Sequence, residues 1–343
     1  MPGVRRRGEE IRKFALRQVE EHPHGLANLV AKTFSISQQT ARAHLGRLTS
    51  GGLLTEQGAT SNRIYFLRVL EDWQKTYQIS SDIDEHQILD VDILPRLTNL
   101  AQNVQSIWST AFTEMFNNVI DHSSATEATV EIRKTAINTE MVIHDNGVGI
   151  FKKIQEALNL SSERYAVVQL SKGKFTTDPS KHSGEDIFFT SKMFDRFDIL
   201  SGGLAFSGDS NNHPKWVTDK FHGGTMVWMK LDNDSTREPK DVYGQFAAGH
   251  DEDFAFNKTA VPIKLAQVGP GGLVSRPQAK RVLAGIDRFK VVALDFTGVD
   301  WIGQGFADEI FRVYQNAHPD IKILVEGASP DVNAMIQRVK TGS

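Results

Sequence analysis

The sequence predicts a multidomain protein of mixed α+β class, and three observations favour this class. With 343 residues the chain is too long for one ordinary core, so two or three domains are expected. Its first 70 residues are basic and show the apolar spacing of helices followed by a hairpin. Further along, a helix with a polar face precedes a glycine-rich turn, and strands alternate with helices after residue 255.

Residues 1–70 are expected to form a small helical domain with a β-hairpin. Eleven basic residues stand against five acidic ones here, in a chain whose formal net charge is -3. Ser37 is well placed to cap the third helix, because a hydroxyl accepts a main-chain N–H of the first turn. The predicted helices and strands cover residues 9–21, 26–33, 38–49, 51–55 and 62–67.

The third of these helices carries candidate DNA-binding residues. Gln39, Arg42 and Arg47 lie on the side opposite its apolar face, beside the small Ala43. Arginine reads guanine and glutamine reads adenine in the major groove. The whole segment resembles a winged helix-turn-helix, which implies DNA binding. Two alternatives to DNA binding remain: the basic face of a small helical domain could simply be solvated, or the winged helix could make protein contacts. In the second case the winged helix could form a homodimer.

Residues 71–97 are expected to be a connector between domains. The acidic run from Asp82 to Asp92 and Pro95 give this stretch a composition unsuited to recognition of nucleic acid. The domain after it is expected to cover residues 98–235, since the polar, turn-rich segment that begins at Asp232 marks a boundary.

The middle domain opens with a helix of two contrasting sides. Glu114, Asn118 and His122 are spaced four apart and share a face, because a helix repeats every 3.6 residues. The opposite side is apolar and can pack on a sheet. Its members are Trp108, Phe112, Met115, Phe116, Val119 and Ile120.

A strand and a glycine-rich turn come next. Residues 141–143 are strand-like, and Asp145 follows with Gly147 and Gly149, which let the backbone turn tightly and approach a ligand. Near residue 225 a Gly-Thr step at Thr225 leads into another apolar strand. Taken singly, these motifs would usually mean a solvated helix face and a hairpin turn.

The three pieces together resemble the GHKL (Bergerat) ATPases, and the spacing Glu-x-x-x-Asn-x-x-x-His is most similar to the anti-sigma-factor kinases. The resemblance implies a GHKL α/β sandwich that binds ATP with Mg²⁺. It implies that Asp145 reads adenine with support from Thr225, and that Asn118 is the magnesium ligand. It further implies that Glu114 acts as the general base for hydrolysis or orients a serine hydroxyl for phosphoryl transfer.

A cover for the phosphates is expected between residues 151 and 190. Lys174 is a candidate cation, and the main-chain amides of Ser183 and Gly184 could hold phosphate oxygens where a helix begins. Asp186 stands where the family usually has a second glycine, and we expect Lys172 or Lys174 to offset its charge.

Residues 255–340 alternate strands and helices and are expected to form a small α/β layer domain. The strand end at Asp295 resembles the STAS domains of anti-sigma-factor antagonists, which implies a protein partner. Residues 302–306 lack the hydroxyl that is phosphorylated in those proteins. Asp308 and Glu309 could hold a metal, but favourable electrostatics at a helix N-terminus is the preferred interpretation.

The composition narrows the remaining choices. Absence of cysteine excludes disulfides, thiol catalysis and cysteine-bound zinc. No apolar run approaches the roughly 20 residues that span a bilayer, so we expect a cytoplasmic protein without a membrane contact. The leading hypothesis is a regulator in which Mg-ATP switches DNA or protein contacts, and the alternative is a serine/threonine kinase of the anti-sigma-factor type. A histidine kinase is disfavoured because His86 lies in a short acidic segment rather than in a helical hairpin.

Overall fold

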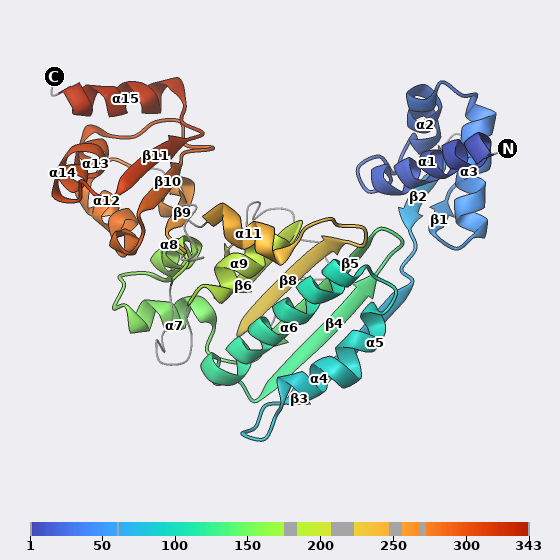
Figure 1. The fold of residues 1–343 in the computed structure, drawn as a ribbon, viewed down its shortest axis with the longest axis horizontal. Helices are drawn as coiled ribbons and strands as arrows, with labels where there is room; N and C mark the ends of the chain where they lie inside the picture. Colours follow the sequence, from blue (N-terminus) through green and yellow to red (C-terminus); the bar gives the residue numbers. More distant parts are fainter. Residues whose placement is uncertain are drawn as a thin grey trace. The chain divides into compact units, whose positions relative to one another are not determined.

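The computed structural model describes residues 2–59, 62–174, 184–206, 223–246, 256–267 and 272–341, with side chains from residue 6 onward. It contains three β-sheets with helices packed on them, which confirms the mixed α+β class (Figure 1). The chain divides into two compact units. The first combines residues 1–76, 129–142 and 229–235, and the second holds residues 77–128, 143–228 and 236–343.

Three helices and a hairpin open the first unit: α1 (Pro2–Gln18), α2 (Leu26–Phe34), α3 (Gln38–Ser50), β1 (Leu54–Gln57) and β2 (Ile64–Leu67). The two strands pair antiparallel. The Ser37 hydroxyl accepts the main-chain N–H of Thr40 at 3.1 Å, so the predicted cap of the third helix is confirmed. The helices share one apolar core, which includes Ile11, Val30 and Leu45.

The largest sheet has six strands in the order β3-β4-β5-β8-β6-β7. The strand predicted over residues 141–143 lies inside β5, and the strand predicted near residue 225 is β8. Both are buried along most of their length, as expected of inner strands. The strands are β3 (Glu71–Gln78), β4 (Glu127–Lys134), β5 (Asn138–Asp145), β6 (Arg196–Ser201), β7 (Leu204–Phe206) and β8 (Thr225–Asp232).

Residues 71–97 do not form the connector that we expected. They supply the edge strand β3, then α4 (Glu85–Ile88), the π-helical η2 (Leu89–Ile93) and α5 (Leu94–Leu97). The acidic residues have local bonding roles. Asp84 caps α4 through the main-chain N–H groups of His86 and Gln87, and Asp92 accepts the Tyr77 hydroxyl at 2.9 Å.

The N-terminal core of the first unit extends to other parts of that unit. Ala136 and Ile137, in the turn between β4 and β5, pack against it. Asp234, just after β8, forms ion pairs with Lys13 and with Arg17. Hydrogen bonds from these two cations, with that from Lys13 the largest cause, hold the pKa of Asp234 below its ordinary value.

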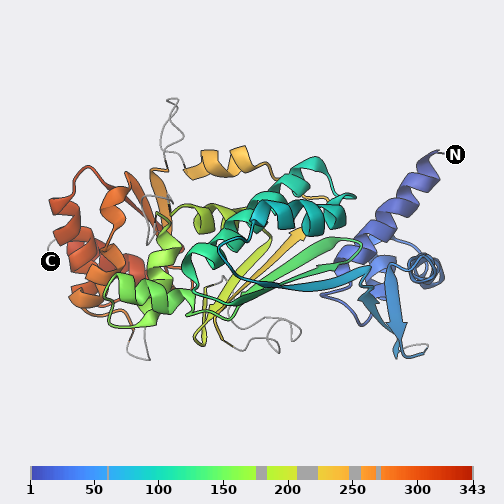
Figure 2. The same ribbon diagram turned by 90° about the horizontal axis from the view of Figure 1, so that it is seen from below.

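The long helix α6 lies along one face of the six-stranded sheet (Figure 2). Its predicted apolar side is confirmed, because Trp108, Phe112 and Phe116 are fully buried, although Ile120 is only half-buried. Glu114 and Asn118, on the polar side, are half-buried. The helices of this region are α6 (Gln102–His122), α7 (Ile150–Ala157), α8 (Glu163–Lys172), α9 (Asp186–Met193) and α11 (Pro239–Phe246).

The C-terminal strands form a separate parallel sheet in the order β11-β10-β9. Ala293 of the central strand is paired with Ala260 and with Leu324. The predicted alternation of strands and helices after residue 255 is confirmed. The elements are β9 (Lys258–Pro262), η3 (Ile263–Ala266), α12 (Arg276–Leu283), η4 (Ile286–Arg288), β10 (Val291–Asp295), α13 (Gln304–Asp308), η5 (Glu309–Tyr314), α14 (Gln315–Ala317), β11 (Lys322–Glu326) and α15 (Pro330–Thr341).

No helix in the described ranges combines the length and the apolar character that crossing a membrane requires.

Candidate functional site

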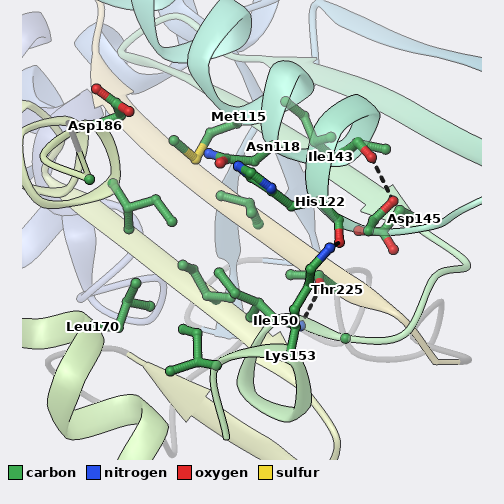
Figure 3. Close-up of a pocket in the computed structure, with 18 residues that line it drawn as sticks. Met115, Asn118, His122, Ile143, Asp145, Ile150, Lys153, Leu170, Asp186 and Thr225 are labelled. Carbon is green, nitrogen blue, oxygen red and sulfur yellow. Dashed lines mark hydrogen bonds between the residues drawn. The ribbon is translucent and has the colours of Figure 1, made fainter. Parts of the chain in front are cut away.

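A cavity in the second unit brings several of the predicted site residues together (Figure 3). Its empty volume is about 880 Å³ with the open mouth included. Asn118, Asp145, Gly149, Gly184 and Thr225 all line it. The walls are mainly apolar and consist of Met115, Val119, Ile143, Ile150, Ile154, Leu170, Ile187, Ile199 and Val227.

Asp145 is a buried carboxylate at the end of β5. Only 3% of the residue is exposed, and its Oδ1 accepts the main-chain N–H of Gly147 at 2.7 Å. Burial raises the pKa of Asp145, while main-chain N–H groups of Gly147 and Thr225 act in the opposite direction. The carboxylate therefore offers a hydrogen-bond acceptor inside an apolar cavity.

The glycines of the turn are required by protein packing. A Cβ at Gly147 would overlap the main-chain oxygen of Ser123 and come within 2.9 Å of Asp145 Oδ1. Gly149 has a φ of 93°, and a Cβ there would lie 2.6 Å from Ser201 Oγ. Both positions thus exclude a side chain, for a reason other than the approach to a ligand that the sequence suggested.

Thr225, at the start of β8, is hydrogen-bonded to the start of α7 next to Asp145. Its hydroxyl accepts the main-chain N–H of Ile150 at 3.0 Å, at the first turn of α7 (Figure 3). Thr225 is itself nearly buried. The threonine that the sequence placed beside the aspartate therefore lies there, and its hydroxyl fixes where α7 begins.

Asn118 lines the cavity from α6. Its side-chain Nδ2 donates to the main-chain oxygen of Glu114 at 2.9 Å, so its Oδ1 is the atom with which it can accept a bond or bind a cation. His122 lines the same wall one turn later, and Lys153 donates from α7 to the main-chain oxygen of His122. That bond caps the C-terminal end of α6.

Asp186 lies at the opposite end of the cavity from Asp145 (Figure 3). It is the first residue of α9, where a helix N-terminus favours a negative charge. Gly184 lines this end too, whereas Ser183 lies outside the described residues. Neither Lys172 nor Lys174, the two lysines expected to offset Asp186, is among the residues that line the cavity.

The two lysines have other roles. Lys174 donates to the main-chain oxygen of Arg288 at 3.4 Å, and its ammonium lies over the rings of Phe256 and Phe289. Lys172 is buried and donates to the main-chain oxygen of Ala284. The contacts of Lys174 are therefore with residues of the C-terminal part of the chain, and burial lowers its pKa while the charge of Glu185 acts in the opposite direction.

Glu114 and Gly147 are also outside the residues that line the described cavity. Glu114 lies one helical turn before Asn118. The pKa of Tyr243 on α11 is raised mainly by burial. The negative charges of Glu114, Asp186 and Glu185 raise it further. This phenol is hence near the carboxylate proposed as the general base.

Two residues near the cavity, Lys153 and Tyr243, were missed by the sequence analysis. Lys153 lies four residues after Gly149, and this spacing places it one turn into α7. Tyr243 belongs to a segment beyond the predicted domain, and its ring lies 4.2 Å from that of Phe189, centroid to centroid. The sequence could have indicated Lys153 through its fixed distance from Gly149, but no local pattern indicated Tyr243.

The candidate DNA-binding residues lie on a free face of α3. Gln39, Arg42 and Arg47 are exposed, while Ala41 and Leu45 face the core. The helix therefore presents an amide and two guanidinium groups to solvent.

A comparison with protein-family models identifies the C-terminal part. The model described as a STAS-like domain of unknown function (DUF4325) matches residues 278–333. This part of the chain is a STAS-like domain. A search of curated proteins finds no match to the chain.

Asp308 and Glu309 of the STAS-like domain are ion-paired. Asp308 contacts Arg276 at 2.8 Å and also Arg312, and Glu309 lies 3.8 Å from Lys280. In the described part of the chain no group of three or more histidine, aspartate or glutamate side chains could hold a metal. The metal interpretation of this pair is therefore not supported.

Proposed function

We propose that the chain is an ATP-binding regulator, in which Mg-ATP in a GHKL-type pocket controls the DNA or protein contacts of flanking domains. The observation that carries the proposal is the convergence of Asn118, Asp145 and Thr225 on one apolar cavity. These residues are far apart in the chain, and they are the ones that the family motifs single out.

The cavity is chemically suited to adenine. A purine is flat and apolar on its faces, and its exocyclic amine is a hydrogen-bond donor. The aliphatic walls at Met115, Ile143 and Ile187 suit the ring faces, and Asp145 supplies a buried acceptor for the amine. The phosphates would then lie toward the other end of the cavity, where Asp186 is also present and a bound cation would offset the negative charge.

The donor set for the metal is also consistent. Mg²⁺ prefers oxygen ligands and keeps several waters, so one amide oxygen with phosphate oxygens is enough. Asn118 lies between Asp145 and Asp186 in the cavity and offers such an oxygen (Figure 3). Main-chain amides near Gly184 would hold the phosphates, and Glu114 would orient the attacking water.

The architecture supports the same proposal. The order of motif helix, motif turn and motif strand along the chain, with α6 over a sheet that contains β5 and β8, is that expected of a GHKL sandwich. Three N-terminal helices followed by an antiparallel hairpin are the elements that a winged helix-turn-helix would require. Exposed Gln39, Arg42 and Arg47 would then read DNA.

A serine/threonine kinase of the anti-sigma-factor type is the second candidate. It is favoured by the presence of a STAS-like domain in the same chain, since the resemblance links such domains with these kinases. The stretch from Ile302 to Phe306 has no hydroxyl, so the phosphate acceptor would be on a separate protein. In this reaction Glu114 would orient the hydroxyl of that protein instead of a water.

Calorimetric titration of the full chain with Mg-ATP tests the proposal. We expect binding that Asp145→Asn weakens by roughly 100-fold, because the amide presents its NH₂ group to the adenine amine or leaves it without an acceptor. Asp90→Asn, which changes an exposed aspartate of η2 in the same way, should bind like the wild type. Absence of binding at millimolar ATP would refute the proposal.

A further inference from the structure

Two helices that border the cavity also contact the STAS-like domain. Leu170 of α8 and Ile187 of α9 line the cavity. Within the same compact unit, α8 packs against β9 and η3 (Figure 1). Rings of α9 pack against Phe256, the residue that precedes β9 by two positions. The cavity wall is therefore in direct contact with the segment around β9, the strand that pairs with β10 of the STAS-like domain.

Lys172, at the end of α8, makes the most specific of these contacts. Its ammonium donates to the main-chain oxygens of Ala284 at 2.6 Å and Arg281 at 3.3 Å, and to Gln169 Oε1 at 3.2 Å. The two main-chain oxygens belong to the C-terminal end of α12, where carbonyls lack helical partners and carry partial negative charge. Lys172 thus caps a helix of the STAS-like domain from α8, the helix that carries the cavity residue Leu170.

Other bonds hold α8 in the same place. Thr259 of β9 donates its hydroxyl to the main-chain oxygen of Lys172 at 2.6 Å, and both residues are fully or almost fully buried. Arg281 donates to the Tyr165 hydroxyl at 2.7 Å and lies over its ring. A shift of α8 would break these bonds and leave buried polar groups without partners, which is costly.

The second helix is attached by aromatic packing. The rings of Phe188 and Phe256 are 4.6 Å apart between centroids, and those of Phe256 and Phe289 are 5.2 Å apart. Gly173, with a φ of 73°, allows this packing, because a Cβ there would lie 2.6 Å from Phe256. Phe289 is buried and lies two residues before β10, so the cluster connects α9 to the core of the STAS-like domain.

We infer that the STAS-like domain is a built-in partner of the nucleotide cavity, with Lys172 as the positioning residue that fixes the α8 wall. The inference rests on the proposed function, and it identifies which part of the chain responds to the nucleotide. Attachment holds Leu170 and Ile187 in place before a ligand arrives, so the ligand pays less of the ordering cost. Linkage then requires the nucleotide to strengthen the attachment by the same factor.

Two variants of the full chain test the inference. Lys172→Met keeps the length of the side chain and removes the ammonium, and Thr259→Val removes only the hydroxyl bond to α8. We expect each to weaken Mg-ATP binding, measured by calorimetry, by roughly 5- to 150-fold. Lys322→Met changes an exposed lysine of β11 and should bind ATP like the wild type.

Hydrogen exchange measures the reverse effect, that of Mg-ATP on the attachment between α8 and the STAS-like domain. Saturating Mg-ATP should slow amide exchange in β9 and α12 of the wild type, and this effect should be lost in Lys172→Met. Melting curves will show that each variant is folded, and Thr259→Val keeps the test valid if the lysine variant does not fold. Unchanged affinity and unchanged exchange in a folded variant, with ATP binding intact, would overturn the coupling alone. A wild type that binds no ATP would overturn the proposed function as well.

Discussion

The hydroxyl of Thr225 accepts the main-chain N–H of Ile150 at 3.0 Å and so joins the first residue of β8 to the first residue of α7. The two residues are 75 positions apart in the chain. Helix α7 begins directly after Gly149, and its first N–H groups have no partner inside the helix. Thr225 therefore stabilises the helix start and also defines the wall next to Asp145.

Thr225→Val should loosen this corner of the cavity. The valine methyl cannot accept the Ile150 N–H, which lies in a nearly buried place, so we expect the free energy of unfolding to fall by about 1–2 kcal/mol. Mg-ATP affinity should fall by about 5-fold or more, since the wall is no longer held in place. Thr225→Ser keeps the acceptor and should retain both quantities; a serine variant as weak as the valine variant would contradict this account. Denaturant titration and calorimetry measure the two effects.

Glu114→Gln should separate binding from chemistry. The amide cannot act as a base, so phosphate release from ATP should fall by roughly 100-fold or more. Mg-ATP affinity should stay within about 3-fold of the wild type, because Glu114 lies outside the cavity lining while Asn118 remains in place. If the wild type releases no phosphate but transfers it to a protein partner, the same variant should lose that transfer. A variant with unchanged turnover would exclude Glu114 as the base.

Arg42→Ala and Arg47→Ala should weaken DNA binding without affecting the fold. Both guanidinium groups are exposed on α3, so their loss should cost little stability. If each contacts a base edge, affinity for a preferred sequence should fall by about 1–3 kcal/mol, and fluorescence anisotropy with selected oligonucleotides would measure this. Arg338→Ala, an exposed arginine of α15 in the STAS-like domain, serves as the matched control. Unchanged DNA affinity in both α3 variants would mean that α3 does not read DNA.

Local chemistry explains which elements could be predicted from the sequence. The cap of α3 depends on Ser37 and Thr40, three residues apart, and it was predictable for that reason. The apolar side of α6 follows from helical spacing alone, and Trp108 and Phe116 are buried as expected. Asn118, Asp145 and Thr225 could be grouped because each belongs to a motif, although nothing in their spacing shows that they meet.

The errors concern contacts between distant parts of the chain. Residues 71–78 are mostly polar and looked like a connector, but they pair with β4, and the hydroxyls of Thr76 and Thr129 lie 2.9 Å apart. Lys172 was expected to help offset the charge of Asp186, but it caps another helix instead. Its partners Arg281 and Ala284 lie more than 100 residues further along, at the C-terminal end of α12, so no local pattern could reveal them.

The stability of the protein should depend on pH through Lys172. Burial lowers the pKa of this ammonium to about 7 from its ordinary value of 10.5. Below pH 7 both the folded and the unfolded chain hold the proton, so the free energy of unfolding does not change with pH through this group. Between about pH 7 and pH 10 the unfolded chain binds a proton that the folded protein does not. Stability therefore rises with pH across this interval, by at most about 1.4 kcal/mol per pH unit.

The comparison of wild type and Lys172→Met isolates this contribution. Desolvation also lowers the pKa values of other lysines, such as Lys134 and Lys192, but these residues are present in both proteins. We would measure the free energy of unfolding of both proteins by denaturant titration from about pH 6 to about pH 9.5. The value for the wild type minus the value for Lys172→Met should be constant up to about pH 7 and should increase above it. Lys322→Met should follow the wild-type curve. Parallel curves for the wild type and Lys172→Met would mean that the folded protein binds its proton at Lys172 as readily as the unfolded chain does, and that the ammonium capping α12 is not desolvated.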